Sequence, residues 1–139
     1  LGHDPGDIDV LAAHPKTRSI IAVEAKDFEV ARTPGEIAAE LEKLFAGKRG
    51  KKPTIELHSR RVDWLRQHLS EVVQHLGVDS DGAPWHLSGA VVTSDPLITP
   101  LMSASPFPVI PFDDLAPTTL RLRPRASQRS PKWKKRKRR

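Results

Sequence analysis

The sequence contains no cysteine and no hydrophobic run long enough to cross a lipid bilayer. Without cysteine, neither a disulfide framework nor a thiolate metal site can form, so any metal ion must be bound by oxygen atoms or by histidine. Hard divalent cations, which prefer oxygen ligands, are therefore favoured. The N-terminus also lacks a charged segment followed by an apolar signal core. These absences predict a soluble, cytoplasmic protein with no membrane partner.

Two common ligand-binding patterns are missing as well. The basic segment 47–53 lacks the spaced glycines, followed by Lys and Ser or Thr, that bind the phosphates of a nucleotide. His68 and His75 are seven residues apart, and no acid between them completes a zinc-binding pattern. The sequence therefore predicts neither a P-loop nor a zinc site, and we expect these two histidines and His58 at the surface or at the boundary of the core.

The formal net charge of +6 is unevenly distributed along the 139 residues. Residues 1–120 contain 12 Lys and Arg against all 17 Asp and Glu, a net charge of −5, whereas residues 121–139 contain the other 11 basic residues and no acid. A block of like charge spaced by proline and serine cannot bury enough apolar surface to fold. We therefore predict one domain, residues 1–120, and a disordered basic tail, residues 121–139.

The end of this tail has the composition of a nucleic-acid-binding segment. Basic side chains bind phosphate backbones by releasing counterions, and an indole ring can stack on a base. The candidate residues are Lys132, Trp133, Lys134, Lys135, Arg136, Lys137, Arg138 and Arg139. A solubilising tail without a partner is the alternative, but an acidic domain does not need a basic tail for solubility.

Two aliphatic segments near the N-terminus predict neighbouring strands. They are Gly6–Ala12 and Ser19–Asp27, and the turn-forming segment 13–17 separates them. Apolar residues occur on both faces of the second segment, which favours a strand in the middle of a sheet covered by helices. In the first segment, the face expected to meet the core carries Ile8, Val10 and Ala12.

Charged residues recur on these two predicted strands. Side chains two positions apart share one face of a strand, so Asp7 and Asp9 project together, and so do Glu24 and Lys26. Burying charged groups beside aliphatic residues is costly unless they are paired. That cost favours a functional site over a purely structural role. The alternatives are an exposed Glu24–Lys26 ion pair of little energetic value and a water-exposed Asp7 at the entry of the strand.

The spacing of these residues resembles a known signature. Asp9, fourteen intervening residues and then Glu24-Ala25-Lys26 are similar to the metal-binding motif of the PD-(D/E)xK nuclease superfamily. Gly6-Asp7-Ile8 also resembles the glycine, acidic and aliphatic positions that precede the metal-binding aspartate in several branches of that superfamily. The chain begins at Leu1, close to the motif, whereas a helix and a strand usually precede the aspartate in that superfamily. We therefore expect a fragment or a part of a larger parent polypeptide.

The resemblance implies a restriction-endonuclease-like fold, a mixed α/β sheet flanked by helices, and metal-dependent hydrolysis of DNA phosphodiester bonds. It assigns Asp9, Glu24 and the backbone carbonyl of Ala25 to the binding of Mg²⁺ or Mn²⁺. It assigns Lys26 to orienting the attacking water and stabilising the transition state. Two further residues are candidate helpers: Asp7 and Lys43.

The rest of residues 1–120 predicts elements that suit such a fold. A helix over 33–47 is indicated by a capping box at Thr33-Pro34-Gly35-Glu36, with a solvated face of Glu36, Glu40, Glu42 and Lys43. A long helix over 54–76 follows, with Trp64 expected to pack. A buried strand over 85–93 should lie parallel to Ser19–Asp27, because a helical crossover joins them. A short proline-containing edge strand is predicted over 107–112.

A basic loop joins the two predicted helices, and its side chains are candidates for contacts with a nucleic-acid backbone. They are Lys48, Arg49, Lys51 and Lys52. The sequence therefore favours a Mg²⁺-dependent deoxyribonuclease whose partner is DNA, with a homodimer or a larger parent polypeptide as the candidate assemblies. One alternative is a non-catalytic nucleic-acid-binding module that acts through the loop and the tail. Another is an interaction domain in which Glu24 and Lys26 form a surface pair and the tail is a localisation signal.

Overall fold

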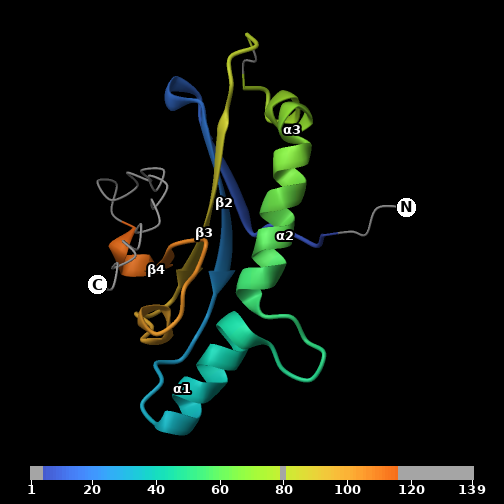
Figure 1. Ribbon diagram of the computed structural model, residues 1–139. Helices are drawn as coiled ribbons and strands as arrows, with labels where there is room; N and C mark the ends of the chain where they lie inside the picture. Colours follow the sequence, from blue (N-terminus) through green and yellow to red (C-terminus); the bar gives the residue numbers. More distant parts are fainter. Residues whose placement is uncertain (1–4, 79–80, 116–139) are drawn as a thin grey trace, which may run out of the picture.

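The computed structural model describes residues 5–78 and 81–115, so the predicted basic tail lies outside the described residues. The described part is a mixed α/β structure with one four-stranded sheet in the order β1-β2-β3-β4. Figure 1 shows helix α2 running alongside the sheet, with α1 at one end of it. The strands are β1 Val10–His14, β2 Ser19–Lys26, β3 His86–Thr93 and β4 Val109–Pro111.

The sheet is mixed in direction. Strands β1 and β2 pair antiparallel, with Val10 opposite Val23, whereas β2 pairs parallel with β3 and β3 pairs parallel with β4. The chain between β2 and β3 contains the helices, as expected for a crossover between parallel strands. The predicted α/β class and the predicted parallel third strand are therefore confirmed.

Strand β1 differs from the prediction in its start and in its buried face. It begins at Val10 rather than at Gly6, and Val10 is 50% exposed. The buried face instead carries Leu11, because the pairing places Leu11 opposite Ala22, which is fully buried in the cluster beneath α2. Before the strand, Ile8 packs against the same cluster as predicted, whereas Asp9 is exposed.

Helix α1, Pro34–Leu41, begins with the predicted capping box. The Thr33 hydroxyl accepts a hydrogen bond from the Glu36 N–H (3.3 Å), and the Glu36 carboxylate accepts one from the Thr33 N–H (2.9 Å). A π-helical segment, Glu42–Ala46, extends the helix to Gly47, whose φ of 75° suits glycine. Glu40 was expected in solvent, but it is only 4% exposed and accepts hydrogen bonds from the backbone and hydroxyl of Thr99.

The predicted long helix is two helices, α2 Thr54–Gln67 and α3 Leu69–His75. They meet at His68, whose φ of −111° and ψ of 19° are not helical. The His68 ring hydrogen-bonds the Trp64 carbonyl (2.8 Å) and stacks on the Trp64 indole, with centroids 4.2 Å apart. Trp64 is 40% exposed, so the expectation that it packs in the core was wrong.

Two buried clusters hold the helices against the sheet. One contains Ala22, Val62 and Leu65 and lies between α2 and the sheet. The other joins the end of β2, the π-helical segment, the start of α2 and β3, and it contains Phe28, Leu44, Ile55 and Val91. Within residues 5–78 and 81–115, no helix is long and apolar enough to cross a membrane.

Candidate active site

Asp9 lies beside the end of β2 that carries Glu24. The antiparallel register ends with Val10 opposite Val23, and Asp9 and Glu24 are the next residues of the two segments. The Asp9 carboxylate accepts a hydrogen bond from the backbone N–H of Ala25 (2.8 Å), which fixes the Asp9 side chain beside the second strand. The two carboxylates that the sequence singled out therefore lie on adjacent segments, with Asp9 exposed and Glu24 buried.

The direction of the Ala25 carbonyl follows from the pattern of backbone hydrogen bonds. The carbonyls of Arg18 and Lys26 accept bonds from the N–H groups of His86 (2.8 Å) and Ser94 (3.2 Å), so even-numbered residues of β2 turn toward β3. In a strand the N–H and C=O of one residue point to the same side. Because the Ala25 N–H bonds Asp9, the Ala25 carbonyl also points toward β1 and the two carboxylates.

These donors fit a small hard cation. Mg²⁺ is usually bound by one or two carboxylates and keeps several water ligands, and two carboxylates with one backbone carbonyl match that pattern. Among residues 5–78 and 81–115, no group of three or more His, Cys, Asp and Glu side chains could hold a metal ion. The remaining ligands of an ion would therefore come from water or from a bound phosphate.

Two cations contact the buried carboxylate of Glu24. Its side chain is only 5% exposed. Lys26 Nζ lies 2.7 Å from Glu24 Oε1, and Arg61 Nη1 donates to Oε2. Arg61 is also largely buried, with 14% of its side chain exposed, whereas Lys26 is 38% exposed. Each oxygen of this buried carboxylate therefore has a cationic partner, which offsets the cost of taking it out of water.

Arg61 comes from α2, and the sequence did not single it out. It lies one helical turn before the buried Leu65 and therefore beside the face of α2 that meets the sheet. The sequence did contain one signal for Arg61: it is a basic residue at the edge of the buried stripe of a helix, and a nearby strand carries a buried acid. This signal identifies Arg61 only once the register of the strands is known.

His58 is a second buried residue of α2 near the site, and the expectation that it lies at the surface or the core boundary was wrong. It is fully buried, its ring contacts the edge of Phe107 with centroids 4.9 Å apart, and Nε2 is 3.2 Å from the Ala22 carbonyl. A carbonyl only accepts, so Nε2 carries the proton and the buried Nδ1 is left without a partner. Burial lowers the pKa of His58, and the negative charge of Glu24 opposes that shift.

This environment predicts a loss of stability in mild acid. Because the pKa of His58 in the folded protein lies below the ordinary value of 6.5, the unfolded chain takes up the proton more readily. The contribution of His58 is complete above pH 6.5 and is lost as the pH falls through 6.5 toward the folded pKa. We expect the free energy of unfolding, measured with urea at about pH 7.5 and about pH 5.5, to fall less in His58→Gln than in the wild type.

The matched control for this experiment is His75→Gln, which removes an exposed histidine from the end of α3. It should leave the pH dependence of the wild type in place. An equal loss of stability in the wild type and in His58→Gln over this pH range would contradict the role given to His58.

The structure does not bring the two candidate helpers to the carboxylate pair. Asp7 is exposed, precedes β1 and forms no ion pair among the described residues. Lys43 is exposed and lines a neighbouring cleft of about 460 Å³. The acids that line the same cleft are Asp27, Glu29, Glu36 and Glu40. Neither Asp9 nor Glu24 lines this cleft, so Lys43 belongs to a separate surface.

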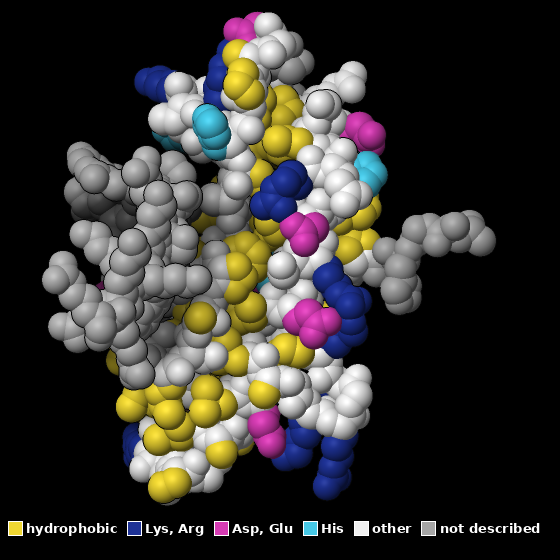
Figure 2. Space-filling model, in the orientation of Figure 1, with side chains coloured by type: hydrophobic (Ala, Val, Ile, Leu, Met, Phe, Trp, Pro, Cys, Tyr) yellow, Lys and Arg dark blue, Asp and Glu magenta, His cyan; other side chains and the backbone are white. Residues whose placement is uncertain are grey.

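The predicted basic loop is a tight turn. Lys48 and Lys51 exchange two backbone hydrogen bonds (3.1 and 2.9 Å), and the intervening Arg49 and Gly50 have φ of 45° and 80°. Lys48 pairs with Glu42 and Lys52 pairs with Glu56, each at 2.8 Å. Arg49 and Lys51 are exposed and form no ion pair among the described residues. Dark blue side chains mark this region at the lower right of Figure 2.

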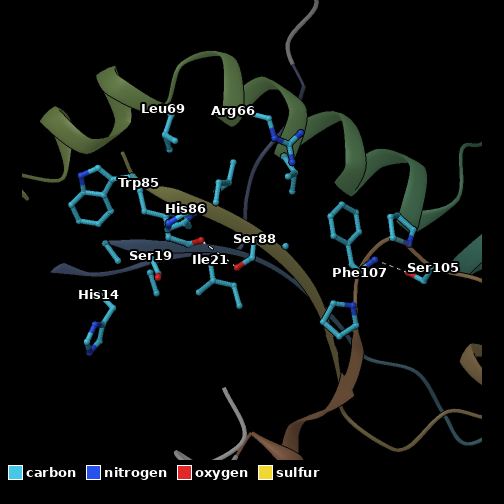
Figure 3. A pocket seen from close by; sticks show the side chains of 18 of the residues that line it. His14, Ser19, Ile21, Arg66, Leu69, Trp85, His86, Ser88, Ser105 and Phe107 are labelled. Atoms are coloured by element: carbon cyan, nitrogen blue, oxygen red, sulfur yellow. Dashed lines mark hydrogen bonds between the residues drawn. The ribbon is translucent and has the colours of Figure 1, made fainter. Parts of the chain in front are cut away.

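A large groove lies away from the carboxylates. It has a volume of about 1710 Å³ and runs along the first half of β3, between α2 and the segment 103–109. Figure 3 shows Arg66 and Leu69 above it, with Trp85, His86 and Phe107 around it. Its lining is mainly apolar, and Arg66, the one Lys or Arg among the described lining residues, is paired with Asp63. The groove therefore lacks the charged groups that phosphate chemistry requires, and none of the residues predicted for catalysis lines it.

Comparison with known proteins supplies a family for this fold and site. A family described as "Anti-phage protein Upx-like" matches residues 1–95, which is more than half of the chain. The chain belongs to the Upx-like family. The matched range includes Asp9, Glu24, Lys26 and Arg61, so the whole carboxylate site lies within the part that defines the membership. Neither a curated protein nor a solved structure matches the chain.

Proposed function

We propose that this protein hydrolyses phosphodiester bonds of DNA with the help of Mg²⁺ or Mn²⁺. The observation that carries the proposal is the hydrogen bond that holds the Asp9 carboxylate at Ala25, next to Glu24, with the Ala25 carbonyl turned to the side of β1. This arrangement agrees with the resemblance to the PD-(D/E)xK nucleases in the order, spacing and strand placement of the residues. Asp9, Glu24 and the Ala25 carbonyl would hold the ion.

Lys26 has the position of a group that acts on the reacting phosphate. Its ammonium contacts Glu24 at 2.7 Å and is partly exposed, so it can reach a water molecule or a phosphate oxygen placed beside the carboxylate. A positive charge held there would orient the water and offset the extra negative charge of the transition state. The ion would supply a water of lowered pKa and would neutralise charge on the attacked phosphate.

The family description suggests the source of the DNA substrate. Because the Upx-like family is described as anti-phage, we propose that the substrate is the DNA of an infecting phage. Arg49 and Lys51, exposed in the basic turn, would contact the backbone of that DNA. The basic tail would add further contacts.

The second candidate function is a DNA-binding module without catalysis. It is favoured by the pairing of both oxygens of Glu24 with cations, since a fully compensated carboxylate is also a stable structural arrangement. Such a module would bind DNA through its basic residues and release no products.

Incubation with supercoiled and linear DNA separates the two functions. We expect products in the presence of Mg²⁺ or Mn²⁺ and none in the presence of EDTA, because the carboxylates bind the substrate phosphate only through an ion. A salt-sensitive gel shift without products under all three conditions would overturn the nuclease proposal and support the binding module.

A further inference from the structure

Arg61 connects three parts of the candidate site. From α2 it donates through Nη1 to Glu24 and through Nε to the carbonyl of Pro5 (3.1 Å). The guanidinium also lies against Gly6, where an added Cβ would be 3.2 Å from Nη2, and Gly6 has a φ of 83°. Arg61 therefore holds the buried carboxylate and, at the same time, the segment that leads to Asp9.

The charges of the site are balanced without a metal ion. Asp9 and Glu24 are acidic, and Lys26 and Arg61 are basic. Arg61 and Lys26 occupy both oxygens of Glu24. Because each oxygen still has a second lone pair, an ion that binds Glu24 would share an oxygen with Lys26 or Arg61 or would displace one of them. A divalent ion placed beside Lys26 and Arg61 is repelled by both cations unless an anion binds with it.

Lys26 and Arg61 would respond differently to an ion that binds Glu24. Lys26 is partly exposed and sits on a flexible chain, so its ammonium can turn toward water. Arg61 is largely buried and stays anchored by the Pro5 carbonyl, so its Nη1 would remain beside the ion, where it needs an anionic partner. A phosphate oxygen is the partner that suits a guanidinium in this position, because Arg binds phosphate with directed, paired hydrogen bonds.

We propose that Arg61 couples the binding of the ion to the binding of the DNA phosphate. Arg61 pairs with Glu24 when no ion is bound, and it pairs with a phosphate oxygen when the ion takes Glu24. This inference rests on the proposed function, and it makes Arg61 a positioning residue. By linkage, DNA and the ion raise the affinity of the protein for each other by one common factor.

The test measures the affinity of the full chain for Mn²⁺, by calorimetry or by electron paramagnetic resonance. It is measured with and without a phosphorothioate DNA oligonucleotide, which resists hydrolysis. In the wild type we expect the oligonucleotide to tighten Mn²⁺ binding by about 5- to 150-fold. In Arg61→Gln we expect tighter Mn²⁺ binding than in the wild type when DNA is absent, and a coupling factor close to one.

The matched control is Arg60→Gln, which removes the neighbouring arginine of α2. Arg60 pairs with Glu56 and not with Glu24, so its loss should leave the coupling as in the wild type. Arg61→Lys keeps a positive charge on a single donor group and should restore part of the coupling. A merely structural role for Arg61 would weaken Mn²⁺ binding with and without DNA, and that result would overturn the inference.

DNA cleavage by the wild type is measured separately. Coupling that depends on Arg61, without cleavage, would uphold this inference and overturn the nuclease proposal. Cleavage by the wild type, together with equal coupling in the wild type and Arg61→Gln, would support the nuclease proposal and overturn this inference.

Discussion

Replacing Lys26 by alanine is expected to lower the rate of metal-dependent DNA cleavage by about 100- to 1,000-fold. The lysine is the partly exposed cation on Glu24, and its removal takes away the positive charge that can reach the attacking water and the phosphate from solvent. The fold should persist, because Arg61 still pairs with Glu24 and leaves the buried carboxylate compensated. The measurement is the initial rate of conversion of supercoiled DNA in Mg²⁺ and in Mn²⁺.

Lys16→Ala is the matched control for this substitution. Lys16 is an exposed lysine in the turn that joins β1 and β2, at the opposite end of β2 from Lys26. It should cleave at the rate of the wild type. Unchanged cleavage by purified, folded Lys26→Ala would remove Lys26 from the catalytic assignment.

Replacing Leu44 by alanine is expected to lower the free energy of unfolding by about 2–5 kcal/mol. Leu44 is fully buried in the cluster that also contains Phe28, Ile55 and Val91. The cluster joins the helices to the end of β2 and to β3, so the cavity left by the substitution cannot collapse without moving one of these elements. Because a domain is stable by only about 5–15 kcal/mol, the loss would be evident in urea denaturation.

Leu101→Ala makes the same chemical change at a residue that is 87% exposed. It should alter the free energy of unfolding by no more than about 0.5 kcal/mol. Figure 2 shows hydrophobic side chains gathered at the lower left, where Figure 1 draws the loop between β3 and β4 that contains this residue. A loss below about 1 kcal/mol for Leu44→Ala would show that the cluster is not closely packed.

The elements with local signals could be predicted from the sequence. The capping box at Thr33, the stop at Gly47 and the strand Ser19–Lys26 depend on neighbouring residues, and the structure has all three. The parallel placement of β2 and β3 followed from the helical excursion between them. These features set the place of Glu24 and Lys26 on one strand, which is why that half of the site could be anticipated.

The buried face of β1 could not be predicted, because apolar residues occur on both of its faces. Val10 and Ala12 suggest one face, and Leu11 and Ala13 suggest the other. The register with β2 decides between them by placing Leu11 on the fully buried Ala22. Long-range pairing, and not local pattern, sets this choice.

The roles of His58 and Arg61 were missed for a related reason. His58 lies between Ile55 and Val62 in the helical repeat of the buried stripe, but its polar ring favoured a surface position. Arg61 lies at the edge of that stripe, and its acidic partner is 37 residues away in the sequence. The break at His68 has no proline or glycine to mark it; at this position the His68 ring bonds the Trp64 carbonyl.

The most direct test of the account is a crystal structure of the full chain soaked with Mn²⁺. The account predicts an anomalous density peak between Asp9 and Glu24, in contact with both carboxylates and the Ala25 carbonyl. A soaked crystal in which Glu24 keeps both of its cationic partners and no peak lies between the two carboxylates, at Mn²⁺ concentrations that support cleavage, would contradict it.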